Sequence, residues 1–191
     1  MTHSFKRTGA VLAAAGIALS LSGAATAVAQ PAGAGAPAAR HCVVSAQDGQ
    51  SQCFGTYREA IGHATGGRVA DAPLSASAAA RDGAFAEELN STAGLSGLVV
   101  LGTIYQDFFF EGQSVTFTGP HDCYNGNSAD YSFDIPAPLQ NHVYSVRPYA
   151  NCWINLFTGF QATGWASPSY KGETVSVDEA WRTHSKSLTL G

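Results

Sequence analysis

The pattern that most constrains this chain is a spacing of an aromatic residue and a glycine that occurs twice. In the first copy Tyr105 is followed by four residues, Phe110, one residue and Gly112, and the second copy has Phe157, Ala162 and Gly164 at the same spacing. Farther along, residues 139–146 align with residues 181–188, which places Trp181 in the second copy. Two copies with one internal spacing indicate a repeated supersecondary unit. The first copy is longer, and we expect its additional residues in the polar loop 121–134.

The residues around this repeat have the sequence pattern of β structure. Residues 98–191 contain short apolar runs separated by Gly, Pro, Asn or Asp, which is typical of an all-β sandwich. The chain has 21 glycines and only 13% charged residues, which favours turn-rich β structure over long helices. We therefore expect one mainly β domain over residues 98–191, with a boundary near residue 96.

Residues 41–97 are expected to form a small helical extension that begins with a hairpin. Cys42 and Cys53 lie on short strand-like pieces on either side of a polar turn, so they can meet across the hairpin. A disulfide closing this loop would contribute roughly 3 kcal/mol by the chain-entropy estimate. Thr56 with Glu59 predicts a capped helix that ends at the following glycine pair, and a second helix is expected over residues 75–89.

The first 29 residues have the three-part layout of a secretory signal. Lys6 and Arg7 precede an uncharged Ala/Leu/Gly-rich run, and small residues occupy positions 25–29. The run is too short and too interrupted for a membrane anchor. Residues 30–40, rich in Pro, Gly and Ala, predict a flexible leader. We expect a secreted, extracellular protein whose four cysteines form two disulfides.

The charge balance argues against nucleic acid as a partner. The chain has 14 acidic and 10 basic residues, and removal of the signal would take away two of the basic ones, Lys6 and Arg7. A net negative surface repels phosphate groups.

We also expect the protein to be a monomer.

The repeat resembles the signature of the βγ-crystallin family over roughly residues 99–191. The resemblance implies a two-motif Greek-key β-sandwich, in which Phe110 packs as a corner on a folded-over hairpin and Gly112 takes a backbone conformation that other residues resist. Secreted bacterial versions carry a phrase similar to residues 149–153 and an earlier cysteine similar to Cys123. The resemblance therefore implies a disulfide between Cys123 and Cys152.

The same resemblance implies calcium binding, through residues 141–146 and 183–188 together with one hairpin residue of each copy. The implied ligand residues are Glu111, Asn141, Val143, Ser145, Thr163, Ser185 and Ser187. Two departures weaken both sites: His142 and His184 stand where the family has Asn or Asp, and neither segment contains a carboxylate. Calcium prefers six to eight oxygen ligands, several of them anionic. We expect degenerate sites with weak calcium binding, and no other cofactor; the two histidines are too few for a zinc site.

No motif in the chain predicts an enzyme. His121, Asp122 and Cys123 suggest a nucleophile, but a cysteine held in a disulfide cannot act as one. The nucleophile-elbow, zinc-protease and phosphate-loop motifs are absent from the sequence. Phe108, Phe109 and Phe110 are consecutive, so an extended hairpin would direct at least one of them away from the core, where an exposed aromatic side chain can anchor a partner. The favoured alternative is that all three rings pack under the hairpin or against the helical extension.

We therefore expect a secreted, non-catalytic βγ-crystallin-like binding module. Two alternatives follow from the resemblance in fold. The first is a peptidase inhibitor, because a family of secreted bacterial metalloproteinase inhibitors adopts this disulfide-stabilised Greek-key fold, and its partner would be an extracellular protease. The second is a killer-toxin-like antimicrobial protein, which rests on fold analogy alone.

Overall fold

A computed structural model describes residues 41–91, 98–124 and 128–191, which all belong to one unit of the chain, residues 36–191. The predicted signal and leader and the predicted boundary near residue 96 lie outside the described residues. The strands are β1 (His41–Ser45), β2 (Ser51–Phe54), β3 (Val99–Tyr105), β4 (Ser114–Gly119), β5 (Tyr131–Asp134), β6 (Ser145–Pro148), β7 (Ile154–Phe157) and β8 (Ser187–Leu190). The helices are α1 (Tyr57–Ala64), α2 (Ala76–Arg81), α3 (Gly83–Ser91) and α4 (Glu179–Arg182), with 3₁₀ turns η1 (Phe108–Phe110) and η2 (Ala137–Leu139).

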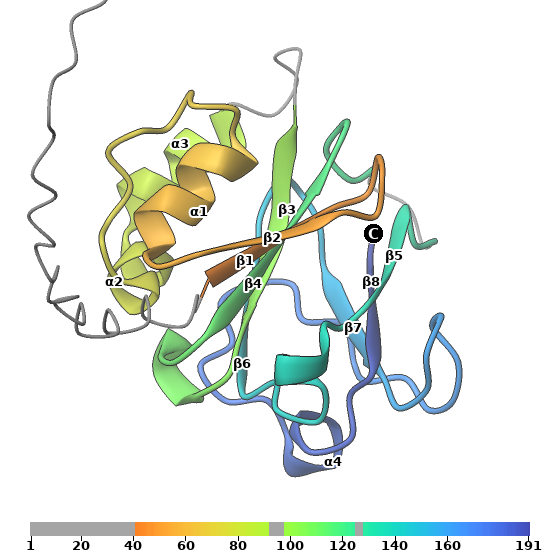
Figure 1. Cartoon of the computed structure of the whole chain (residues 1–191). Helices are drawn as coiled ribbons and strands as arrows, with labels where there is room; N and C mark the ends of the chain where they lie inside the picture. Colours follow the sequence, from red (N-terminus) through yellow and green to blue (C-terminus); the bar gives the residue numbers. More distant parts are fainter. Residues whose placement is uncertain (1–40, 92–97, 125–127) are drawn as a thin grey trace, which may run out of the picture. The chain divides into compact units, whose positions relative to one another are not determined.

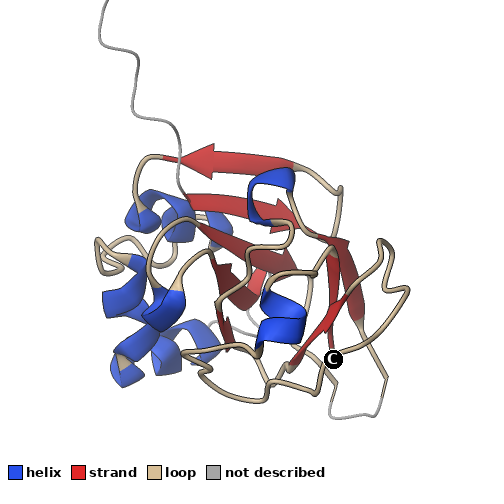
Figure 2. Cartoon of the chain, turned by 90° about the horizontal axis from the view of Figure 1, so that it is seen from below, coloured by secondary structure: helices blue, strands red, loops and turns tan. Residues whose placement is uncertain are grey.

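Two sheets pack face to face. The first has the strand order β2-β1-β4-β3-β6 and the second the order β5-β8-β7. Figure 1 shows α1, α2 and α3 on one side of the first sheet and the strands of the second sheet on the other. In Figure 2 several helices gather on one side of the strands, while short helical segments also lie among the strands. Between the sheets the rings of Phe117 and Phe133 lie 4.8 Å apart, and Ile104, Ile154 and Leu188 are fully buried. The expected fold class, mainly β with a helical disulfide-bridged extension, is confirmed.

Each repeat gives one strand to the sheet of the other repeat. In the first repeat β3, β4 and β6 lie in one sheet, while β5 pairs with β8 of the second repeat. In the second repeat β7 and β8 lie together, and Thr174 forms a bridge to Val146 in the sheet of the first repeat. This exchange of the third strand makes the two Greek keys interdependent.

Both repeats contain a folded-over corner hairpin that is fastened by a serine. The Ser145 hydroxyl accepts a hydrogen bond from the Phe110 N–H (3.0 Å) and donates one to the Asp107 carbonyl (2.7 Å). The Ser187 hydroxyl accepts from the Ala162 N–H (3.0 Å) and donates to the Gly159 carbonyl (2.6 Å). The serine bonds therefore repeat in register with the sequence repeat.

The corners require left-handed backbone at equivalent positions. Phe109, Phe110 and Gly112 have φ of 58°, 68° and 77°, and Gln161, Ala162 and Gly164 have φ of 53°, 54° and 81°. At Gly112 a Cβ atom would also lie 2.4 Å from a carboxylate oxygen of Asp107. The glycine spacing therefore has two physical causes, the sign of φ and the space beside Asp107.

The extension joins the first sheet directly. β1 pairs in parallel with β4 from His41↔Ser114 to Ser45↔Thr118, and β2 pairs antiparallel with β1. A β domain separated from the extension would lose this ladder of hydrogen bonds.

The helices of the extension begin where their capping residues predict. The Thr56 side chain accepts from the Glu59 N–H while Glu59 reaches back to the Thr56 N–H, which is a capping box for α1. The single second helix expected over residues 75–89 is wrong, because α2 and α3 are separate helices. Asp82 has extended backbone between them, and its carboxylate accepts from the Phe85 N–H at 3.1 Å, which starts α3.

Both predicted disulfides are confirmed. Cys42 is bonded to Cys53 across the β1–β2 hairpin, and Cys123 is bonded to Cys152. In the part of the chain that the structure describes, no helix has the length and apolar character needed to cross a membrane.

The first sheet presents a polar face to the helices. Thr103, Thr116 and Thr118 are buried there, and the hydroxyls of Thr103 and Thr116 lie 3.0 Å apart. Tyr57 of α1 lies against this face with Tyr105 and Tyr149, and none of the three phenol hydroxyls has a hydrogen-bond partner of ordinary geometry among the described residues. Burial raises the pKa of all three phenols, because the phenolate would lose its hydration.

The raised phenol pKa values predict a loss of stability in alkali. Folded Tyr57, Tyr105 and Tyr149 keep protons that the unfolded chain releases above about pH 10, so the free energy of unfolding is steady below that pH and falls above it. Each such phenol contributes a slope of up to about 1.4 kcal/mol per pH unit. Urea unfolding between about pH 8 and pH 11 measures this slope. Tyr57→Phe should reduce it, and equal stability across that range would contradict the prediction.

The corner hydrogen bonds of Ser145 and Ser187 predict that replacing either serine lowers stability, by unequal amounts. Ser145→Ala leaves the buried Phe110 N–H without a partner and should lower the free energy of unfolding by about 1–3 kcal/mol. Ser187→Ala should cost less, because the Ala162 N–H is only partly buried. Ser132→Ala, on an exposed position of β5, is the control and should change stability by less than about 0.5 kcal/mol. Urea unfolding curves measure all three, and a reversed order of Ser145 and Ser187 would count against the corner argument.

Candidate functional site

The corner hairpin of the first repeat carries exposed apolar side chains. Phe108 and Phe109 are 37% and 55% exposed, whereas Phe110 is fully buried against Tyr105. Val175, from the loop before α4, is 39% exposed and lies beside them, because its carbonyl accepts from the Phe109 N–H at 3.0 Å. We call Phe108, Phe109 and Val175 the first tip. The favoured expectation that all three phenylalanines pack is therefore wrong, because two of the three rings are exposed.

Phe109 is held in an unfavourable conformation by three separate parts of the chain. Its φ of 58° and ψ of 28° are left-handed, which costs a non-glycine residue roughly 1–2 kcal/mol. Its N–H donates to Val175, and its carbonyl accepts from the Arg81 guanidinium of α2 at 3.1 Å. Hydrogen bonds from the extension and the second repeat therefore hold the Phe109 backbone, and the Ser145 bonds hold the corner on either side of it.

Phe108 is surrounded by an aromatic ring and a cation. Its ring meets the Tyr144 ring edge-on, with centroids 4.9 Å apart. The Arg182 guanidinium lies 5.1 Å from the Phe108 ring centroid and 5.5 Å from that of Tyr144. Arg182 also approaches the exposed carboxylate of Glu179 at 3.7 Å, a contact that is screened by water. The first tip is thus an apolar surface flanked by two arginines, Arg81 and Arg182.

The equivalent tip of the second repeat differs at the decisive position. Phe160 is 46% exposed and Trp165 80% exposed, and the Lys186 ammonium lies 5.5 Å from the Phe160 ring centroid. The residue equivalent to Phe109 is Gln161, whose N–H donates to an Asp134 carboxylate oxygen at 2.7 Å. Both repeats therefore expose an aromatic residue, but only the first places a second ring at the left-handed apex.

The hydroxyls among the predicted calcium ligands already serve the fold. Ser145 and Ser187 fasten the corners, the Ser185 hydroxyl donates to the Trp181 carbonyl, and the Thr163 hydroxyl donates to the Phe160 carbonyl at 2.7 Å. The carbonyls of the two hairpin residues are engaged as well. That of Glu111 accepts from the Asp107 N–H (3.2 Å), and that of Thr163 accepts from the Gly159 N–H (2.9 Å).

The two predicted calcium segments lie next to each other. The Asn141 N–H donates to the Ser185 carbonyl at 2.8 Å, and the Val143 N–H donates to the Arg182 carbonyl at 3.1 Å. His142 and His184 are exposed and make local contacts with the Gln140 carbonyl and the Thr183 hydroxyl. Within the described ranges no three His, Cys, Asp or Glu side chains gather as a metal site would require.

The residues that hold the first tip could not be found from the sequence. Val175, Arg81 and Arg182 are distant from Phe109 along the chain, and none belongs to the repeated spacing. The three consecutive phenylalanines were the available signal. Cys123 is bonded to Cys152, so the sequence from His121 to Cys123 does not offer a thiol nucleophile.

Comparison with protein-family models and with curated proteins finds no match. Among solved structures, a βγ-crystallin domain from Flavobacterium johnsoniae is similar at 14% identity and a TM-score of 0.36, covering 48% of this chain and 93% of that one. A βγ-crystallin domain from Clostridium beijerinckii covers 47% and 95% at 16% identity and a TM-score of 0.35. One from the Abundant Perithecial Protein of Neurospora crassa, in its Ca²⁺-bound form, covers 48% and 87% at 16% identity and a TM-score of 0.35.

Scores this low do not themselves carry a fold assignment, which rests on the geometry of the chain. Two Greek keys exchange their third strands, and each has a corner hairpin with left-handed residues and a serine fastening. By these features residues 98–191 form a βγ-crystallin-like double Greek key.

Proposed function

We propose that this protein is an exported, non-catalytic binding module that engages an extracellular protein through its first tip. The observation that carries the proposal is Phe109, an aromatic residue that is 55% exposed in a left-handed conformation and fastened from three sides. Backbone strain at an exposed side chain persists where the surrounding structure enforces it, and such positions cluster at binding sites. A glycine or asparagine would be easier to accommodate at this φ.

The composition of the first tip suits a protein partner. Aromatic residues and arginine are enriched among the residues that contribute most to protein interfaces, and here Phe108 and Phe109 lie between Arg81 and Arg182. The fixed backbone lowers the conformational entropy lost on binding. Export is supported by the two disulfides, since such bonds persist in oxidising compartments.

A peptidase is the second, more specific candidate for the partner. A rigid hairpin with an apolar side chain at its apex would fill a protease cleft at little cost in conformational entropy. The first tip has this form: Phe109 stands at the apex, and Ser145 ties the hairpin on both sides of it.

Phe109→Asn tests the role of the apex in binding. The change removes the exposed ring and relieves the left-handed strain, so the free energy of unfolding should stay within about 1 kcal/mol of the unmodified protein or rise. Inhibition titrations of thermolysin and of subtilisin with the mature chain provide the readout. If the inhibitor candidate is right, one protease is inhibited by the unmodified protein and inhibition falls at least tenfold in the variant.

Gln161→Asn is the matched control, because it introduces the same residue, asparagine, at the equivalent left-handed position of the second repeat. It should leave inhibition unchanged. Full inhibition by Phe109→Asn would remove the first tip from the mechanism, and no inhibition of either protease by the unmodified protein would set the peptidase candidate aside.

Calcium should hardly stabilise the protein. A site with a millimolar Kd contributes only about 0.4 kcal/mol at millimolar calcium, whereas a micromolar site would contribute roughly 4 kcal/mol. We propose weak binding because the serine hydroxyls are engaged and histidine replaces an oxygen ligand in each segment. Thermal unfolding with calcium and with a chelator measures the difference.

Replacing His142 and His184 by Asp supplies a carboxylate in each segment and should increase the calcium shift. A large shift in the unmodified protein would overturn the claim that the sites are degenerate.

A further inference from the structure

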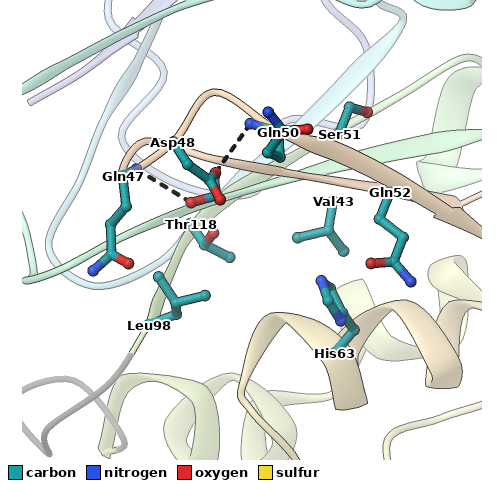
Figure 3. A pocket seen from close by; sticks show the side chains of 10 residues that line it. Val43, Gln47, Asp48, Gln50, Ser51, Gln52, His63, Leu98 and Thr118 are labelled. Atoms are coloured by element: carbon teal, nitrogen blue, oxygen red, sulfur yellow. Dashed lines mark hydrogen bonds between the residues drawn. The ribbon is translucent and has the colours of Figure 1, made fainter.

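A cavity of about 470 Å³ opens where the β1–β2 hairpin lies above α1 and the start of β3 (Figure 3). This volume falls within the range of roughly 300–1,000 Å³ that is usual for small-molecule sites. In Figure 3, His63 rises from α1 towards Val43 and Gln52, and Leu98 and Thr118 close the opposite side. The cavity lies apart from the first tip, and it is lined by none of the residues of that tip.

The cavity is lined by neutral hydrogen-bonding groups. Three amides come from Gln47, Gln50 and Gln52, and hydroxyls come from Ser45, Ser51 and Thr118. Each amide presents both a donor and an acceptor, and the Ser51 hydroxyl can act as either. The Ser45 hydroxyl keeps its own proton to donate, and the Thr118 hydroxyl, which donates to the Val44 carbonyl at 3.4 Å, keeps its lone pairs to accept. Such groups match the hydroxyls of a ligand that must itself donate and accept.

The same lining argues against charged ligands. None of the described residues that line it is a lysine or an arginine, so among them only the imidazole of His63 could balance a phosphate or a carboxylate. Asp48 is the single carboxylate, which is too few for calcium. Val43 and Leu98 add apolar surface, on which the C–H face of a ring can pack.

The hairpin wall of the cavity is shaped in advance. An Asp48 carboxylate oxygen accepts from the Gln50 N–H at 3.0 Å, and the Ser45 hydroxyl accepts from the Gln47 N–H at 3.2 Å. The Cys42–Cys53 bond ties the two strands together, and the Phe54 ring, 5.1 Å from the imidazole of His63, orients that side chain. Preorganised groups lose little conformational entropy on binding.

From this lining we propose that the cavity binds a neutral sugar, a single pyranose unit of a free or attached glycan. The amides and hydroxyls bond the sugar hydroxyls, while Val43 and Leu98 meet its C–H face. The cavity and the first tip are different parts of the molecule, so the proposal of sugar binding and the proposal of protein binding can fail independently.

The test uses the mature chain, residues 30–191, labelled with ¹⁵N, and three neutral probes: maltotriose, cellotriose and tri-N-acetylchitotriose. We expect at least one probe to shift the backbone amide signals of residues 47–52 and of His63, with a Kd on the order of 1 mM. Inorganic phosphate is the charged probe and should leave these signals in place. Signals that do not move with any sugar, or that move only elsewhere in the chain, would overturn the proposal, and so would phosphate binding in the cavity.

Two variants assign the binding to the cavity. Gln52→Ala removes an amide from an exposed strand position and should weaken binding roughly three- to tenfold, the loss of about one hydrogen bond. His63→Ala should weaken it similarly, which keeps the test valid if one variant folds poorly. Gln106→Ala makes the same change as Gln52→Ala outside the cavity and should bind like the unmodified protein. Equal affinity in all three variants would mean that the sugar binds without using the cavity.

Discussion

One serine hydroxyl in each repeat holds the corner hairpin in place through two hydrogen bonds. At Ser145 a single oxygen joins the strand β6 to both sides of the corner, and it compensates for the left-handed backbone at Phe109 and Phe110. The bonds of Ser145 add to those that Val175 and Arg81 make with Phe109, and together they hold the left-handed corner over the sheet. The corner in turn buries Phe110, exposes Phe109 and fixes the position of the first tip.

The two repeats share this construction and differ in what covers them. The outward face of the first sheet is rich in threonine and tyrosine, a composition suited to water, but it is buried beneath α1 and its neighbours. The cost is visible in three phenol hydroxyls that have no hydrogen-bond partner of ordinary geometry within the described ranges. The parallel pairing of β1 with β4 offsets that cost, because it adds a full ladder of backbone hydrogen bonds. The extension is thus built into the sheet and also supplies Arg81 to the first tip.

The two proposed binding surfaces have opposite character. The first tip is apolar, aromatic and flanked by cations, while the cavity beside the β1–β2 hairpin is concave and lined by amides and hydroxyls. The extension contributes to both. The proposed protein-binding tip and the proposed sugar-binding cavity share no residues, so each has its own variants to separate their roles.

The sequence by itself determined the repeat, the corner glycines, the α1 cap and the β class, because each depends on local backbone chemistry that a few neighbouring residues decide. Thr56 and Glu59 are three residues apart, and Gly112 is required by its own φ. The hairpin disulfide is equally local. The split of the second helix at Asp82 is local as well, because the Asp82 carboxylate accepts from the Phe85 N–H and starts a new helix.

Only the tertiary structure decided which distant segments of the chain contact one another. The pairing of β1 with β4, the exchange of third strands, and the meeting of Val175 and Arg81 at Phe109 join residues far apart in sequence, and no local pattern records such contacts. The same holds for the use of Ser145 and Ser187. In the sequence they read as calcium ligands, and in the folded chain their hydroxyls are engaged at the corners, because a buried N–H must find an acceptor.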